Sequence, residues 1–176
     1  MIRLNSARHV RTLGFIAAAS LLLAAFAACG PATSTSTNTA PIKIGFTVSL
    51  TGDFSADGKA IQQGYQLWAD TINAHGGLLG RKVELDMLDD ASSAEQVTTD
   101  YQKLISVDKV DLTFGPFSTL LTKPASVVTH RYGYALPEGA GGGPSVFQQG
   151  LNNVFDVSLP VANNLVSFAQ WILSLP

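Results

Sequence analysis

The chain has 176 residues, of which 46% are hydrophobic, and a net charge of −2. This length accommodates one ordinary domain and a little more. No cluster of Lys or Arg follows Arg11, so the chain lacks the basic surface of a nucleic-acid-binding protein. Its single cysteine, Cys29, excludes a disulfide bond within the chain.

Residues 1–28 have the organisation of a secretory signal peptide. Three arginines, Arg3, Arg8 and Arg11, precede an uncharged apolar run from Leu13 to Ala28. The run is about 16 residues long, which is shorter than the roughly 20 residues that span a bilayer. We therefore predict a cleaved signal peptide, with an uncleaved membrane anchor as the alternative.

Cys29 stands where a bacterial lipoprotein signal places its lipidated cysteine, directly after two small residues. We predict lipidation at Cys29 and an extracytoplasmic, lipid-anchored location in the bacterial cell membrane, whether in the periplasm or on the outer cell surface. The alternative is a chance cysteine at the end of a signal peptide. Residues 29–41 are rich in Thr, Ser and Pro and predict a flexible tether.

Strands and helices are predicted to alternate from residue 42 onward. Ile42–Val48 reads as a strand, and residues 81–88 as a second strand that ends at Asp89-Asp90. Between them lies a helix that ends at the pair Gly76-Gly77. Its apolar residues recur with helical spacing: Ile61, Tyr65, Trp68 and Ile72. A strand, a helix and a second parallel strand form a βαβ unit.

The next unit begins with a predicted capping box. Ser92, followed three residues later by Glu95, predicts the start of a helix that runs to about Ser106. Residues 110–114 are then expected to form a short third strand that ends before Gly115.

The second half continues the alternation. Pro124 is tolerated only in the first turn of a helix, so a helix is expected to start near Thr122. Residues 134–137 and 153–157 predict two more strands, and residues 161–174 predict a last helix. In the third helix, we expect Val127, Val128 and Tyr132 to face the sheet. In the last helix, Leu165, Phe168 and Ile172 recur with helical spacing and are expected to share one face.

This order predicts an α/β fold with a parallel sheet and helices on both faces. The loops at the carboxyl ends of parallel strands gather at one edge, where such folds bind ligands. Hydroxyl groups and free N–H groups near a helix start suit a carboxylate or another small anion, and aromatic rings offer apolar cover. The candidates from the first and third strand loops are Thr51, Phe54, Ser55, Phe117, Ser118 and Thr119.

No group of residues predicts catalysis or a metal site. His75 and His130 each lack a second ligand at metal-binding spacing. Asp89 and Asp90 form a solvated turn in our interpretation, because adjacent residues at a strand end point to opposite faces. The alternative is a metal or acid–base pair.

The glycine-rich run 139–143 contains a G-x-G pattern, but Pro144 follows it. We expect no helix to open there, and a dinucleotide site needs a helix N-terminus for the pyrophosphate. No cofactor is therefore predicted.

The chain resembles a known family in the order and spacing of its segments. It is similar to the branched-chain amino-acid (Leu/Ile/Val) type of ABC-transporter solute-binding protein, over about residues 42–159. The matching segments are 49–54, 72–85, 89–92, 114–119 and 131–137.

The resemblance implies the type I periplasmic-binding-protein fold, in which two α/β lobes close on a small ligand. Residues 42–152 would then form an incomplete first lobe, and residues 153–176 a crossover strand and the first helix of the second lobe. The resemblance therefore suggests an N-terminal fragment of such a protein.

The resemblance also implies ligand contacts. The third-strand loop, with Ser118 and Thr119, and the fourth-strand loop would hold the carboxylate and amino groups of an amino-acid ligand. The fourth-strand residues are Ala140, Gly141 and Gly142. A hydroxyl residue is common in the family at the position of Gly142, and a basic residue at that of Asp156. The ligand class therefore stays open between an amino acid, an amide and a related small acid.

The predicted function is capture of a small polar ligand by a lipoprotein that delivers it to an ABC permease in the membrane. No enzymatic activity is predicted. A sensory or receptor domain of the same fold, an extracytoplasmic enzyme and a non-functional truncated fragment are the alternatives.

Overall fold

The computed structural model describes residues 39–158 and 165–175. The predicted signal peptide 1–28, the predicted lipidation site Cys29 and most of the predicted tether 29–41 lie outside these residues, as do residues 161–164 of the last predicted helix. Among the described residues, no helix is both long enough and apolar enough to span a bilayer.

The strands are all parallel, as the sequence predicts. β1 (Ile42–Val48) pairs with β2 (Val83–Asp89) on one side and with β3 (Leu112–Thr113) on the other. A second parallel pair is formed by β4 (Leu136–Glu138) and β5 (Val154–Asp156). The strands thus form two sheets, in the orders β2-β1-β3 and β4-β5, and the backbone N–H of Gly115, just after β3, donates a hydrogen bond to the carbonyl of Pro137 in β4.

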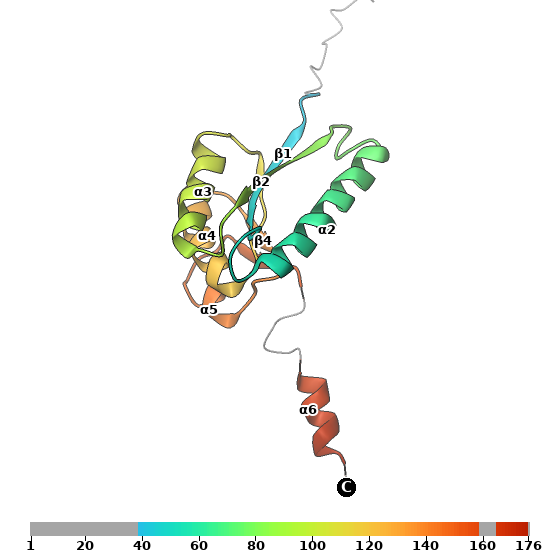
Figure 1. Cartoon of the computed structure of the whole chain (residues 1–176), viewed down its shortest axis with the longest axis vertical. Coiled ribbons are helices and arrows are strands. Elements are labelled where there is room, and N and C mark those ends of the chain that lie inside the picture. The colour runs from blue at the N-terminus through green and yellow to red at the C-terminus, as the bar shows by residue number, and fades with distance from the viewer. Residues whose placement is uncertain (1–38, 159–164, 176) are drawn as a thin grey trace, which may run out of the picture. The chain divides into compact units, whose positions relative to one another are not determined.

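The helices lie on both faces of this layer of strands, which confirms the predicted fold class. Helix α2 (Ser55–Ala74) covers one face, and α3 (Ala94–Ser106) and α4 (Thr119–Arg131) cover the opposite face (Figure 1). A short helix, α5 (Pro144–Phe147), follows β4, and α6 (Val166–Leu173) is the last element.

The two faces of β1 explain this layering. Side chains alternate along a strand, and the residues of one face form a buried row beneath α2: Ile42, Ile44, Phe46 and Val48. On the other face, Gly45 leaves room for α3 to approach. A Cβ at this position would lie only 2.7 Å from a methyl group of Val110 and 3.2 Å from one of Leu104. The sheet therefore has a packed core on each side of its central strand.

The predicted cap of α3 is wrong by one residue. Ser93 is the N-cap, and its hydroxyl accepts a hydrogen bond from the backbone N–H of Gln96. Ser92 has a positive φ of 60° and bonds to the preceding loop through its hydroxyl. Sequence spacing alone could not separate these two neighbouring serines, because only the backbone conformation decides which one caps the helix.

The third helix starts earlier than predicted. α4 begins at Thr119 instead of near Thr122, which places Pro124 inside the helix. This shift also changes the buried face: Val128 is buried as predicted, whereas Val127 and Tyr132 are exposed. The buried residues are instead Leu121, Thr122, Ala125, Ser126, Val128 and Thr129.

Two further expectations differ from the structure. A helix does open after the glycine-rich run, since α5 starts at Pro144 with Gly143 as its N-cap, although it has only four residues. The third and fifth strands are shorter than predicted, and the fourth starts and ends later. Short strands at the ends of a sheet depend on their neighbours for pairing, so local patterns place their ends poorly.

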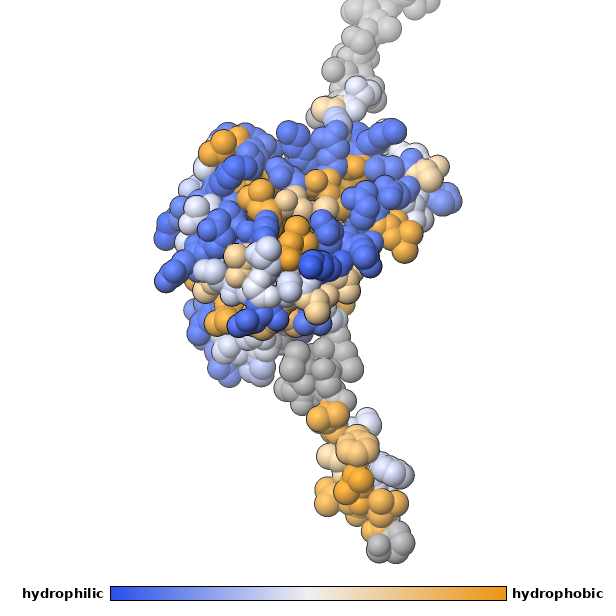
Figure 2. Space-filling view, viewed as in Figure 1, coloured by the Kyte–Doolittle hydropathy of each residue, from blue (hydrophilic) through white to orange (hydrophobic). Residues whose placement is uncertain are grey.

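Helix α6 has no buried residue. The residues predicted to lie in phase, Leu165, Phe168 and Ile172, are all exposed. Its surface is largely apolar (Figure 2).

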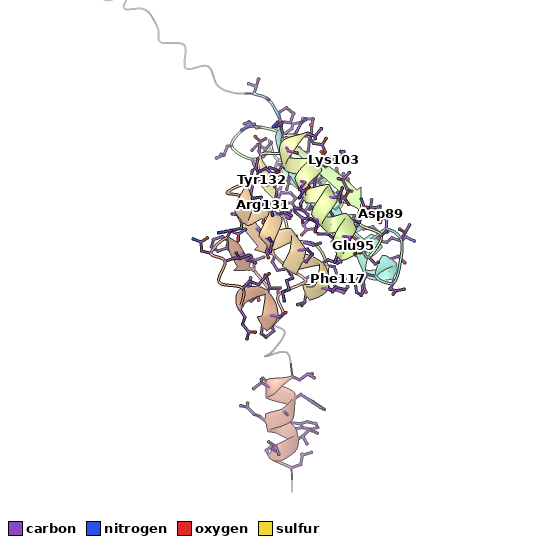
Figure 3. All side chains as sticks on the ribbon, turned by 90° about the vertical axis from the view of Figure 1, so that its left-hand side faces the viewer. Asp89, Glu95, Lys103, Phe117, Arg131 and Tyr132 are labelled. Atoms are coloured by element: carbon purple, nitrogen blue, oxygen red, sulfur yellow. The ribbon has the colours of Figure 1, made fainter. Side chains whose placement is uncertain are left out.

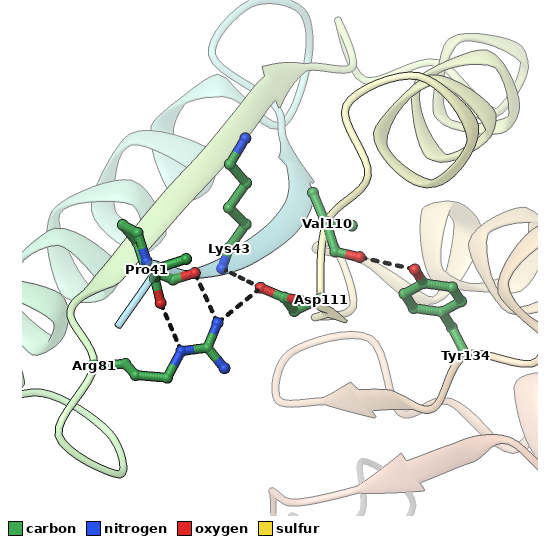
Figure 4. A network of polar contacts seen from close by, with 7 residues as sticks. Pro41, Lys43, Arg81, Val110, Asp111 and Tyr134 are labelled. Carbon is green, nitrogen blue, oxygen red and sulfur yellow. Dashed lines mark hydrogen bonds and ion pairs between the residues drawn. The ribbon is translucent and has the colours of Figure 1, made fainter. Parts of the chain in front are cut away.

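A polar network fixes the start of β1 (Figure 4). The guanidinium of Arg81 donates to the carbonyl groups of Ala40 and Pro41 at 2.6 and 3.0 Å and lies 3.9 Å from the carboxylate of Asp111. The same carboxylate accepts from the backbone N–H of Lys43 at 2.9 Å. This network lies at the amino end of β1, opposite the edge where the strand loops gather.

Candidate functional site

Four loops at the carboxyl ends of β1 to β4 form the candidate site. We call them the first loop (49–54), the second loop (90–93), the third loop (114–118) and the fourth loop (139–143). Figure 3 shows Asp89, Glu95 and Phe117 toward this edge, whereas Lys103, Arg131 and Tyr132 lie toward the other end of α3 and α4.

Asp89, the last residue of β2, ties the first loop to the second. Its carboxylate accepts hydrogen bonds from the backbone N–H of Leu50 at 2.9 Å and from the hydroxyl of Thr51 at 2.8 Å, as well as from the N–H of Ala91. Burial alone would raise the pKa of Asp89, but these hydrogen bonds outweigh it and lower the pKa. Thr51, a predicted ligand-binding residue, therefore also stabilises the first loop through its hydrogen bond to Asp89.

Gly52 brings these two loops into close contact. Its φ of +80° is a conformation that favours glycine, and a Cβ here would lie 2.6 Å from the carbonyl oxygen of Ala91. The hydroxyl of Ser92 then donates to the carbonyl of Thr51 and accepts from the N–H of Phe54.

The interpretation of Asp89-Asp90 as a solvated turn is wrong for Asp90, which is fully buried. Its carboxylate accepts from the hydroxyls of Thr47 at 2.7 Å and Ser49 at 2.6 Å and from the N–H of Ser92. The two aspartates do point to different partners, as alternation requires. In the described part of the chain, no group of three or more His, Cys, Asp or Glu side chains could hold a metal ion.

The predicted residues of the first, third and fourth loops do meet. The rings of Phe54 and Phe117 contact edge to face, with their centroids 5.5 Å apart. The hydroxyl of Thr119 accepts from the N–H of Gly143 at 3.1 Å. Gly141 lies against the backbone of Ser118, where a Cβ would come within 2.8 Å.

Ser118 and Ser55 sit at the starts of two helices. Ser118 is the N-cap of α4, and its backbone carbonyl accepts from the N–H groups of Leu121 and Thr122, but its hydroxyl makes no capping hydrogen bond. Ser55 is the first residue of α2. The edge thus offers a hydroxyl and two helix N-termini beside a pair of aromatic rings.

Glu138 is the residue that the sequence analysis missed. It ends β4 and is fully buried beneath the fourth loop. Its Oε1 accepts from the backbone N–H groups of Ala140 and Gly141. A Cβ at Gly115 would lie 2.5 Å from its Oε2, so glycine is needed opposite it. An acidic residue between an apolar strand and a glycine run is the signal that could have revealed it.

The surroundings of the Glu138 carboxyl group favour its protonated form. The hydroxyl of Thr122 lies 2.8 Å from the carbonyl oxygen of Pro116 and 2.9 Å from Glu138 Oε2. One hydroxyl has a single proton to donate. Thr122 therefore shares its one proton between these two acceptors, and Glu138 Oε2 has at most part of a hydrogen bond from it. Consistently, burial raises the pKa of Glu138 to about 7, although hydrogen bonds from Thr122 and Ala140 oppose the rise.

A second carboxyl group approaches the fourth loop from β5. Its Oδ2, on Asp156, would lie 2.6 Å from a Cβ at Gly142. The Oδ1 of Asp156 accepts from the N–H and the hydroxyl of Ser158 at 2.9 Å. The space that a side chain at position 142 would need is therefore filled by Asp156.

A cavity of about 540 Å³ opens beside these loops, on the side of the sheet that α2 covers. Of the predicted site residues it includes Ala140. Its other lining residues are Ile61, Gly64, Tyr65, Trp68, Phe114 and Gly139. The remaining predicted residues form an edge next to this cavity instead of its wall.

Comparison with known proteins identifies the family. The family described as periplasmic binding protein matches residues 41–173. The chain belongs to the periplasmic binding protein family. This match covers every described strand and helix, and it confirms the resemblance found in the sequence.

Relatives in sequence carry names of the same family. The Leu/Ile/Val-binding protein BraC3 of Rhizobium johnstonii is 33% identical over 115 residues, which are 65% of this chain and 31% of that protein. The "Leu/Ile/Val-binding protein homolog 8" of Brucella abortus is 31% identical over 126 residues, or 72% of this chain and 31% of the relative.

Solved structures show the same fold. The branched-chain amino-acid transporter substrate-binding protein LivJ of Streptococcus pneumoniae, in complex with isoleucine, superposes with a TM-score of 0.65 at 28% identity, over 72% of this chain and 38% of LivJ. A solute-binding protein of Rhodopseudomonas palustris in complex with 3,4-dihydroxybenzoic acid gives 0.66 at 24% identity, over 76% and 36%. The chain thus spans about a third of the length of the relatives it matches.

Proposed function

We propose that this chain is part of an extracytoplasmic solute-binding protein that captures a small polar ligand for an ABC importer. The observation that carries the proposal is the edge of four strand loops in a chain of the periplasmic binding protein family. Relatives named for Leu, Ile and Val, and a structural neighbour that holds isoleucine, support a ligand of amino-acid size.

In this proposal, the described loops form one wall of the ligand site. The hydroxyl of Ser118 and the N-terminus of α4 anchor a polar group of the ligand, because N–H groups and the partial positive charge gather there. Phe54 and Phe117 cover its apolar part. Binding and release carry the function, and no catalytic step is assigned to any residue.

The binding test uses the purified full-length protein that contains this chain and a panel of amino acids, amides and short acids, in thermal shift and calorimetry. We expect at least one ligand to bind, and Ser118→Ala to weaken its binding about five- to tenfold through loss of one hydrogen bond. Ser145→Ala, an exposed serine in α5, is the matched control and should leave affinity unchanged. A panel without any binding ligand would contradict the proposal.

We further propose that Cys29 carries the lipid that holds the protein at the membrane, near its ABC permease. This proposal rests on the sequence of residues 1–29. Expression of the chain in bacteria with an alkyne fatty acid should label it, and Cys29→Ser should abolish the label and move the protein to the soluble fraction. Equal labelling of the wild type and the variant would show that the lipid is not at Cys29.

A further inference from the structure

Three turns at the amino ends of the strands each present one exposed apolar residue. The turns join α2 to β2, α3 to β3 and α4 to β4, and the residues Leu79, Val107 and Tyr132 are 95%, 68% and 43% exposed. Because each turn follows a helix and precedes a parallel strand, all three lie at the same end of the strands. We call the surface of these turns (residues 75–82, 107–111 and 132–135), together with the start of β1, the amino end. It lies opposite the candidate site, and Figure 3 shows Tyr132 at this end of α4.

Leu79 is held in solvent by a tight turn. The backbone N–H of Leu78 donates to the carbonyl of Arg81 at 2.8 Å, and the N–H of Arg81 donates back to Leu78 at 2.9 Å, so residues 79 and 80 form the tip of the turn. Leu79 has a φ of 53°, a left-handed conformation that Asn or Gly adopts more readily than leucine. The turn thus exposes a large apolar side chain at a position where a polar residue would fit the backbone better.

Cations accompany these apolar residues. Lys82 and Lys109 are exposed in the first two turns, and Arg131 is exposed at the end of α4, next to the third turn. Lys43 is also exposed, at the start of β1. Within the part of the chain that the structure describes, none of these four cations takes part in an ion pair. Their charges are therefore available to an anionic partner.

The two ends of the domain differ in charge. The acids at or near the amino end are Asp70, Glu84, Asp108 and Asp111. The last two lie in ion pairs with Lys103 and Arg81. The opposite end has two exposed cations among a larger number of exposed or half-buried acids: Lys59, Lys123, Asp53, Asp57, Asp89, Glu95 and Asp156. This distribution favours an approach to a negatively charged surface with the amino end first and the candidate site facing away.

The chain also connects to Cys29 at the amino end. Arg81 donates hydrogen bonds to the carbonyls of Ala40 and Pro41 and so fixes the point where the preceding segment joins the domain (Figure 4). The segment from Cys29 to Pro41 can span at most about 40 Å. A lipid at Cys29 would therefore hold the amino end nearer to a membrane than the candidate site.

We propose that the amino end of this domain docks on an anionic phospholipid surface. The apolar side chains of the three turns enter the headgroup region, and the cations beside them contact lipid phosphates. Tyr132 suits this position, because its ring is apolar and its hydroxyl remains hydrated. Docked in this way, the domain keeps its four loops open to solvent. The inference goes beyond the proposed function, and the proposed lipid at Cys29 would strengthen the docking.

The first test measures how the full-length protein that contains this chain sediments with vesicles of phosphatidylcholine, with or without phosphatidylglycerol. Every protein carries Cys29→Ser, so no lipid chain contributes, and residues 1–28 are the same throughout. We expect tighter binding to the anionic vesicles, and a loss of more than about tenfold in Lys82→Glu/Lys109→Glu, because each cation near such a surface accounts for about a fivefold difference. Lys59→Glu/Lys123→Glu makes the same change in net charge at the opposite end and should bind as the wild type does.

The second test removes the apolar contact and keeps the fold. Asn suits the left-handed conformation at position 79, so Leu79→Asn should not lower the melting temperature, whereas its binding to anionic vesicles should fall about tenfold. Leu67→Asn, which replaces an exposed leucine within α2, is the control and should keep wild-type binding.

Binding that survives either Lys82→Glu/Lys109→Glu or Leu79→Asn overturns the proposal. An equal loss in Lys59→Glu/Lys123→Glu also overturns it, because the vesicles would then respond to net charge alone. If the amino-end variants bind vesicles normally but reduce ligand uptake by cells, the amino end contacts a protein instead of a membrane. Vesicle binding needs no ligand, so the ligand panel decides the proposed function independently of this result.

Discussion

Replacing Gly58 by alanine is expected to lower the free energy of unfolding by about 3 kcal/mol. Gly58 lies in the first turn of α2, where a Cβ would come 2.0 Å from the carbonyl oxygen of Ser49 and 2.7 Å from its carbonyl carbon. Both are backbone atoms, so no side-chain rotation relieves the overlap. The helix must shift away from the end of β1, and the first loop shifts with it.

Gly64→Ala is the matched control for this prediction. Gly64 lies in the same helix, but a Cβ there would meet nothing within 4 Å. Alanine should therefore raise the stability of the chain by about 0.5–1 kcal/mol, since it lowers the entropy cost of helix formation. Thermal unfolding should separate the two variants by roughly 10 °C or more. Equal melting temperatures would show that the close approach of α2 to β1 is not a constraint.

Replacing Glu138 by glutamine is expected to stabilise the chain at pH 8 by about 3 kcal/mol and to have little effect at pH 4.5. Burial raises the pKa of Glu138 from 4.5 to about 7 in the folded chain, so the folded state holds the proton more tightly than the unfolded state. The contribution of this group to the stability of the chain is therefore fully present below pH 4.5. This contribution is lost as the pH rises through 7. Glutamine resembles the protonated form and removes this loss.

The charged groups around Glu138 also favour a raised pKa for its carboxyl group. The carboxylate of Asp156 raises its pKa further, and no opposing cation contributes to it. Burial, and to a smaller extent the charge of Glu138, also raises the pKa values of Tyr65 and Tyr101, so both tyrosines stay neutral in this pH range.

The measurement is the free energy of unfolding of both forms, from urea titrations between pH 4.5 and 8. The difference between variant and wild type cancels the contributions of the other acids, such as Asp89. Glu84→Gln, at an exposed position on β2, is the control for the exchange of a carboxyl group for an amide. A difference for Glu138→Gln that does not change with pH would mean that folding leaves the pKa of this carboxyl group unchanged.

Some residues of the candidate site could be predicted from the order of elements along the chain, whereas others depend on the packing of the folded chain. Thr51, Phe54 and Ser118 could be assigned to one edge, because loops at the ends of successive parallel strands must gather there. The roles of Asp90 and Glu138 could not be assigned in this way. Their hydrogen-bond partners lie in other strands and helices, and only folding shows that these carboxyl groups turn inward.

The sequence by itself determined the alternation of strands and helices, the parallel sheet with helices on both faces and the family, because these depend on periodicity and on the spacing of turn residues along the chain. The start of α4 and the choice of Ser93 as the cap of α3 were decided only by the tertiary structure. So was the orientation of the fourth loop, since a buried carboxyl group from the end of β4 determines which way its peptides face. Local patterns do not contain that information, because the donor and acceptor atoms meet only after the sheet has formed.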